Sequence, residues 1–195
     1  QERRFRALQG GDMERPEVVY IVGLSHSGST ILDLILGSHS QIESVGELIN
    51  LREEVTGEWP RSGLCTCKKP YQECEYWISI LNGYESRVKA DLGENIDPLD
   101  LRGVERNISL WKKIKTVFMK REDMPPEINS FCRKYYHLVQ TILTHTNKKI
   151  LCDSSKDAFP AYLLYRSGYV NLKIIHLFRD LRGNIESTKR RAQNH

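Results

Sequence analysis

The chain has 195 residues, of which 39% are hydrophobic and 28% charged, and its formal net charge is +4. This composition excludes a disordered or fibrous protein and fits one globular domain with a buried core. The positive charge suits a small anionic ligand and is too weak to indicate a nucleic-acid partner.

The sequence contains no visible membrane anchor. No apolar run reaches the roughly 18 to 20 residues that a membrane-spanning helix needs, and the charged N-terminus lacks the apolar core of a signal peptide. The five cysteines form no evenly spaced framework, which favours reduced thiols and a cytoplasmic location. Because the chain begins with Gln1, removal of an anchor and a Golgi lumen location is the alternative.

The first predicted elements are a strand and a helix joined by a glycine-containing loop. Residues 1–15 are polar and predict a tail, and the β-branched run 18–22 predicts a buried strand. An apolar helix over 31–36 ends at Gly37. Residues 45–47 end a second short extended segment, and we expect a helix over 48–54.

A loop and a helical stretch follow. Glycines, prolines and three cysteines predict a loop over 55–75. Apolar residues three and four apart predict helices over 101–119 and 128–144, on either side of Pro125 and Pro126.

Strands and helices alternate again near the C-terminus. We expect strands over 149–152 and 172–178 and helices over 158–166 and 181–191. This order predicts an α/β fold in which a parallel sheet lies between two layers of helices. We expect residues 1–195 to form a single domain with 55–147 as a loop and helical insertion, and the natural protein to continue beyond His195.

The segment Gly23–Thr30 between the first strand and helix has the spacing G-x-x-x-x-G-x-T of a phosphate-binding loop. Glycines permit the tight turn that directs several N–H groups and the helix N-terminus at an anion. Ser29 stands where nucleoside triphosphatases have the Lys that reaches the β- and γ-phosphates, which argues against ATP and Mg²⁺. A strand-to-helix turn that contains glycines by chance is the alternative.

A second candidate anion site follows the last strand. Arg179 and Ser187 are eight residues apart, so an Arg at the strand end and a hydroxyl two turns into the next helix can reach one ligand beside the sheet. A guanidinium fork with a hydroxyl is suited to phosphate.

With these two motifs the chain resembles the sulfotransferases that use 3′-phosphoadenosine 5′-phosphosulfate (PAPS). GLSHSGSTILDLIL is similar to the family's 5′-phosphosulfate loop, and LFRDLRGNIEST is similar to its 3′-phosphate motif R-D-P-R-D-x-x-x-S, with Leu181 in place of Pro. The resemblance covers residues 18–50 and 149–191. It implies a P-loop NTPase-like topology, PAPS as co-substrate and no metal.

The resemblance also implies the donor-binding residues. Arg179 and Ser187 would bind the 3′-phosphate. The 5′-phosphosulfate would contact the residues of the loop, namely Ser25, His26, Ser27, Gly28, Ser29 and Thr30. His26 stands where the family commonly has Lys or Arg, so a protonated imidazole would have to supply the charge and activity would depend on pH.

Three residues are candidates for catalysis. Gly46-Glu47 resembles the Gly-Glu of tyrosylprotein sulfotransferases, which implies that Glu47 is the base; a helix cap is the alternative. Lys156 follows a predicted strand and would offset charge on the leaving group, with His26 as a second electrophilic group. An ordinary exposed lysine is the alternative for Lys156, and Asp153 and Ser155 are expected to cap a helix.

Cys65, Cys67 and Cys74 form C-x-C-x₆-C in the predicted loop. No His lies nearby and the paired C-x-x-C spacing is missing, so a disulfide or plain loop packing is favoured over zinc.

The predicted function is sulfuryl transfer from PAPS to a hydroxyl or amine. The alternatives are a P-loop kinase-like enzyme and a catalytically inactive nucleotide-binding protein. No motif identifies the acceptor, which leaves carbohydrate, tyrosyl peptide, lipid and small molecules open.

Overall fold

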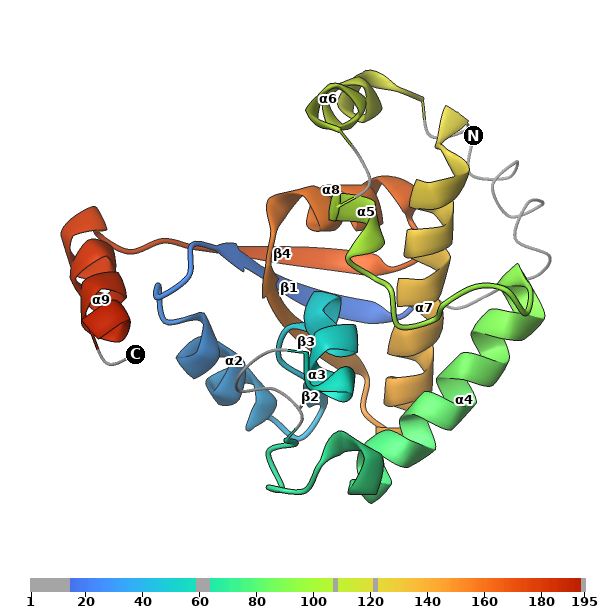
Figure 1. The fold of residues 1–195 in the computed structure, drawn as a ribbon, viewed down its shortest axis with the longest axis horizontal. Helices are drawn as coiled ribbons and strands as arrows, with labels where there is room; N and C mark the ends of the chain where they lie inside the picture. The colour runs from blue at the N-terminus through green and yellow to red at the C-terminus, as the bar shows by residue number, and fades with distance from the viewer. Residues whose placement is uncertain (1–14, 59–63, 107–108, 121–122, 194–195) are drawn as a thin grey trace.

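A parallel sheet forms the centre of the computed structural model, which describes residues 15–58, 64–106, 109–120 and 123–193 (Figure 1). Within these residues the sheet has four strands in the order β2-β3-β1-β4, and every pairing is parallel. The strands are β1 (Glu17–Gly23), β2 (Ile42–Ser44), β3 (Ile150–Lys156) and β4 (Asn171–Leu177). The tail predicted over 1–15 lies, apart from Arg15, outside the described residues.

Helices connect the strands and surround the sheet. The helices are α2 (Ser29–Gly37), α3 (Leu51–Thr56), α4 (Glu75–Leu92), α5 (Gly103–Arg106), α6 (Leu110–Phe118), α7 (Pro126–Thr146), α8 (Ala158–Ser167) and α9 (Leu181–Gln193). Two single 3₁₀ turns are η1 (Leu48–Asn50) and η2 (Tyr71–Glu73). No described helix is both long enough and apolar enough to cross a bilayer.

Two neighbouring residues of β3 show that α2 and α7 cover opposite faces of the sheet. Asp153 accepts a hydrogen bond of 2.7 Å from the Tyr135 hydroxyl of α7. The thiol of Cys152 instead lies against Asp33 of α2, and burial together with this contact raises the pKa of the thiol. Because successive side chains of a strand point to opposite faces, the sheet lies between two helical layers, and the predicted α/β fold is confirmed.

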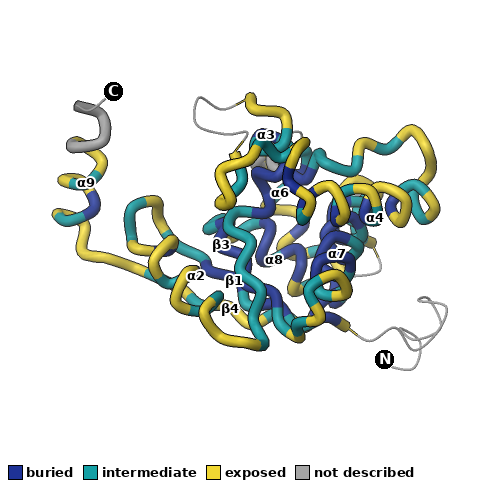
Figure 2. The backbone as a smooth tube through the Cα atoms, turned by 90° about the horizontal axis from the view of Figure 1, so that it is seen from below, coloured by how far each residue is buried: buried dark blue, intermediate teal, exposed yellow. Residues whose placement is uncertain are grey.

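The hydrophobic core lies mainly on the α7 face. Figure 2 shows the buried backbone gathered in β1, β3, α7 and α8. Fully burying one such side chain contributes about 1.5–3 kcal/mol, so this layer dominates the stability. The largest fully buried side chains of the cluster are Tyr20, Leu48, Ile80, Tyr84, Leu101, Ile128, Leu138, Ile142, Leu151, Leu163 and Leu164.

The predicted elements are confirmed around both motifs and differ in the middle of the chain. Helix α4 was not predicted, although Trp77, Ile80, Tyr84 and Val88 are buried at helical spacing. The single helix expected over 101–119 is two helices, α5 and α6. Strand β3 extends to Lys156 rather than ending at residue 152, because its polar residues are buried within the sheet.

Candidate functional site

The phosphate-binding loop and the Arg179 motif lie at the same side of the sheet, where β1, β3 and β4 have their carboxyl ends; this side is called the sheet edge below. Val22 of β1 pairs with Lys156 of β3, and Gly23 pairs with Leu177 of β4. At this edge β1 leads into α2 and β4 leads into α9 (Figure 1). Ligands of open α/β sheets bind beside the carboxyl ends of the strands, so the register alone brings the candidate residues together.

The loop between β1 and α2 has the backbone of an anion-binding turn. Gly28 at the N-cap of α2 has a φ of 96°, and His26 has a φ of 65°. A Cβ on Gly28 would contact nothing within 4 Å, so the space above the turn is open. Such a turn directs successive N–H groups and the N-terminus of a helix toward one anion.

The side chains of this loop differ in exposure. Ser29 is buried, whereas Ser25 and Thr30 are exposed and His26 and Ser27 are half-buried. The hydroxyls of Ser25 and Thr30 are therefore more accessible to a ligand than that of Ser29. No lysine stands at the position that would reach a triphosphate tail.

Gly23 permits β4 to approach the start of the phosphate loop. A Cβ at this position would lie 2.3 Å from the carbonyl oxygen of Leu177. Only glycine avoids this clash without moving the strand. The close approach also brings the residues that follow β4 to the phosphate loop.

The second motif contacts the first directly. Arg179 Nη1 donates a hydrogen bond of 3.2 Å to the carbonyl oxygen of His26, and Asn184 Nδ2 lies 3.4 Å from Ser27 Oγ. A guanidinium has five N–H donors, so Arg179 retains donors for a phosphate. Ser187 lies half-buried in α9, the helix that Arg179 precedes. Asn184 was not predicted as a site residue, although it lies within the second motif.

Asp180 fixes the start of α9. Its carboxylate accepts hydrogen bonds from the N–H groups of Arg182, at 2.9 Å, and Gly183, at 3.1 Å. A Cβ on Gly183 would lie 2.9 Å from Nε of Arg179. The sequence of this motif thus caps the helix and leaves room for the guanidinium beside it.

Glu47 and Lys156 form an ion pair at the same edge of the sheet. The second carboxylate oxygen of Glu47 accepts a hydrogen bond of 2.8 Å from Asn50 Nδ2. Glu47 occupies the N-cap position of η1 and makes no capping hydrogen bond with its side chain, so the alternative role as a helix cap is not what the structure shows. The Glu47 side chain is 37% exposed and that of Lys156 is 15% exposed, so solvent and a substrate can reach the carboxylate.

Asp153 and Ser155 bind the segment that carries Glu47. Asp153 Oδ1 accepts a hydrogen bond of 3.4 Å from the N–H of Leu48, and Ser155 Oγ accepts one of 3.1 Å from the N–H of Ile49. The two residues were predicted to cap a helix, and they do so from within β3, because they accept hydrogen bonds from the first N–H groups of η1. Nothing local in the sequence could reveal a cap from a distant strand.

The buried Asp153 gives the fold a measurable pH dependence. Burial raises the pKa of Asp153 to about 6, despite hydrogen bonds from Ser155, Tyr135 and Leu48 that favour the charged form. The unfolded chain loses this proton near pH 3.9, so between about pH 4 and 6 only the folded state retains it. Stability is therefore expected to fall with rising pH in this window, by about 3 kcal/mol in total.

Urea unfolding at several pH values between 4 and 7 tests this expectation. Asp153→Asn cannot titrate, so the difference in slope between the wild type and this variant isolates the contribution of Asp153 from those of other carboxyls. Equal slopes for the two proteins would show that Asp153 is ionised throughout the window.

Two residues of the candidate site have a strained backbone. Described non-glycine residues with positive φ are His26, Lys68, Asn147 and Lys156, and two of them are predicted catalytic residues. Such conformations cost of order 1–3 kcal/mol and cluster at functional sites. Lys156 has a φ of 70°, where β3 ends and its side chain meets Glu47.

Comparison with known proteins identifies the family. Residues 16–195 match the model of the sulfotransferase family, which covers both motifs and the helical stretch between them. Neither the curated proteins nor the solved structures yielded a match. The contact between the two predicted motifs agrees with the family match, and the chain belongs to the sulfotransferase family.

Proposed function

We propose that the protein transfers the sulfuryl group of PAPS to a hydroxyl or amine of an acceptor and releases 3′,5′-adenosine bisphosphate. The observation that carries this proposal is the meeting of two anion-binding motifs and the Glu47–Lys156 pair at one sheet edge. We propose one catalytic domain over residues 1–195, since a single hydrophobic cluster joins elements from β1 to α8.

The donor would lie along the carboxyl ends of β1 and β4. Its 5′-phosphosulfate would contact the backbone N–H groups and hydroxyls of the loop Ser25–Thr30, and its 3′-phosphate would contact Arg179 and Ser187. The contact between Arg179 and the carbonyl of His26 supports this arrangement, because the two motifs meet there. This chemistry needs no metal.

Glu47 would act as the general base. A carboxylate oxygen has two lone pairs. Each oxygen of Glu47 can therefore take a proton from the substrate hydroxyl or amine while it keeps its hydrogen bond to Lys156 or Asn50. As the proton moves to Glu47, the acceptor oxygen or nitrogen forms a bond to sulfur, and the bond between sulfur and the bridging phosphate oxygen breaks. The electron pair of that bond remains on the released bisphosphate.

Lys156 and His26 would stabilise the charge that develops in this step. The Lys156 ammonium lies beside Glu47 and can donate a hydrogen bond to the bridging oxygen as negative charge accumulates there. His26, when protonated, would supply positive charge to the sulfuryl oxygens. The family match supports sulfuryl transfer, and the positions of these residues support the roles proposed for them.

Calorimetric titration with 3′,5′-adenosine bisphosphate and, in parallel, with ATP and Mg²⁺ tests the proposed donor. We expect a Kd of about 1 μM for the bisphosphate, which corresponds to about −8 kcal/mol, and binding of ATP that is weaker by two orders of magnitude or more. Preferential binding of ATP would support the kinase-like alternative. A folded chain that binds neither ligand would contradict the proposed donor site.

A further inference from the structure

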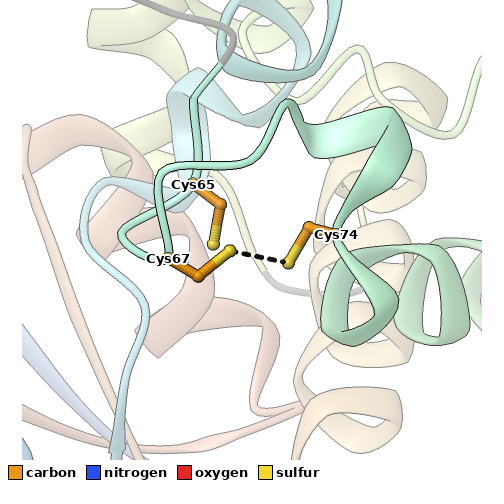
Figure 3. A group of neighbouring side chains, drawn as sticks. All are labelled: Cys65, Cys67 and Cys74. Atoms are coloured by element: carbon orange, nitrogen blue, oxygen red, sulfur yellow. Dashed lines mark hydrogen bonds between the residues drawn. The ribbon is translucent and has the colours of Figure 1, made fainter.

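Three cysteine sulfurs converge outside the site described above. The Sγ atoms of Cys65, Cys67 and Cys74 all lie within 4.8 Å of one another (Figure 3). Cys65 and Cys67 belong to the segment between α3 and η2, and Cys74 immediately precedes α4. Among the described residues this is the one group of three or more potential metal ligands whose donor atoms come together in this way.

A tight turn presents Cys65 and Cys67 on the same side. Leu64 and Pro70 form an antiparallel bridge, the Cys65 N–H donates to the Lys69 carbonyl at 2.8 Å, and the Lys68 N–H donates to the Cys65 carbonyl at 2.8 Å. The turn requires Lys68 to adopt a φ of 66°. A left-handed conformation costs a non-glycine residue roughly 1–2 kcal/mol, which further interactions of the turn must offset.

The third sulfur is fixed by the hydrophobic core. Cys74 is 4% exposed and occupies the N-cap position of α4. Its side chain makes no capping hydrogen bond there. The buried Trp77 ring, three residues further along α4, packs against Tyr71 and Tyr76 with ring centroids 5.3 Å apart in each case. Core packing at the start of α4 therefore holds Cys74 in place. The Cys65 sulfur lies 3.8 Å from the hydroxyl oxygen of Thr66.

The spacing of the sulfurs distinguishes a metal site from a disulfide. Cys67 Sγ and Cys74 Sγ are 3.6 Å apart, whereas a disulfide bond is about 2.05 Å long. Two thiolates bound to one tetrahedral zinc ion at about 2.3 Å lie about 3.8 Å apart. A disulfide would also leave the third sulfur without a role, whereas a metal ion uses all three.

We propose that Cys65, Cys67 and Cys74 bind one Zn²⁺ ion as thiolates. Soft thiolate ligands select zinc over hard cations such as Mg²⁺ and Ca²⁺. The three thiolates would supply three of the four tetrahedral positions around the ion. The sequence favoured a disulfide or loop packing over zinc, because no His lies nearby and paired C-x-x-C spacing is missing. The turn at Lys68 brings the three sulfurs together with C-x-C spacing instead.

The ion would have a structural role that is independent of the proposed sulfuryl transfer. It would tie the turn at Cys65 and Cys67 to the first turn of α4. Gln72 of η2 already donates a hydrogen bond to the carbonyl of Val55 in α3. Zinc would therefore fasten α3, the loop and α4 to one another, with the catalytic edge of the sheet left unchanged.

Elemental analysis of the full chain, purified under reducing conditions and dialysed, tests the site. We expect one zinc per chain, and the loss of this zinc in Cys67→Ser but not in Cys132→Ser, whose thiol is buried elsewhere in α7. Refilling the chelator-treated wild type with Co²⁺ should give thiolate-to-cobalt charge transfer and the visible bands of a tetrahedral site. This titration needs no variant and therefore does not depend on the folding of Cys67→Ser.

Three outcomes would overturn the proposal. Zinc retained equally by Cys67→Ser would show an adventitious ion. Mass spectrometry that finds Cys67 disulfide-bonded to Cys74, or three freely alkylated thiols in a metal-free folded chain with no Co²⁺ spectrum, would show that the cluster is not a metal site. Because binding of 3′,5′-adenosine bisphosphate uses other residues, it should persist after zinc removal, and failure of one proposal leaves the other testable.

Discussion

Glu47→Gln is expected to lower the rate of sulfuryl transfer by about 10²- to 10⁴-fold, the usual contribution of a general base. The amide keeps the size of the side chain and can still accept a hydrogen bond from Lys156, but it cannot take the acceptor's proton. Affinity for 3′,5′-adenosine bisphosphate should be unchanged. Transfer is measured with ³⁵S-labelled PAPS and a panel of carbohydrate, tyrosyl peptide, lipid and small alcohol or amine acceptors.

Glu54→Gln is the matched control, because Glu54 is a half-buried carboxylate on the neighbouring helix α3. It should retain wild-type transfer. Full activity of Glu47→Gln would exclude Glu47 as the base. Loss of both transfer and nucleotide binding would mean instead that the Glu47–Lys156 pair maintains the shape of the donor site.

Arg179→Ala is expected to weaken binding of 3′,5′-adenosine bisphosphate by about 10- to 100-fold, because a hydrogen bond to a charged group contributes about 1.5–3 kcal/mol. The same variant should bind adenosine 5′-phosphate as the wild type does, since that ligand has no 3′-phosphate. Calorimetry with both nucleotides measures the two effects separately. Arg182→Ala, an exposed arginine at the start of α9, should change neither.

The pair of ligands separates two roles of Arg179. Its guanidinium also donates to the His26 carbonyl, so it could act by supporting the phosphate loop. Equal weakening of both nucleotides would assign it that supporting role, and unchanged binding of the bisphosphate would remove it from the donor site altogether.

The elements that carry the motifs could be predicted because their signals are local. The β-branched strand ends at Gly23 and the apolar helix ends at Gly37, so glycines within the same short segment mark where each element stops. Helix α4 also has a local signal, since Trp77, Ile80, Tyr84 and Val88 recur at helical spacing, and this signal was missed. Its packing against α7 is a tertiary contact that the separate segments do not reveal.

The candidate site was predicted as a set of residues but not as an arrangement. Lys156 and Glu47 are 109 residues apart, and their pairing depends on the register in which β3 lies between β2 and β1. The polar run from Asp153 to Ser155 gave no sign of a buried strand, because its side chains are satisfied by η1 and α7 as well as by each other. Such tertiary hydrogen bonds override the local pattern.

The segment η1 is attached more firmly to the sheet than the Arg179 side chain is to the phosphate loop. Its amides at Leu48 and Ile49 are bound to side chains of a central strand, so the part of the protein that carries Glu47 can open only if the interior of the sheet is disturbed. Arg179, in contrast, is an exposed side chain bound to an exposed turn. Low-energy opening is confined to weakly buried contacts of this second kind. In the proposed reaction, the Arg179 side of the site would thus open to release the bisphosphate while the segment that carries Glu47 stays in place.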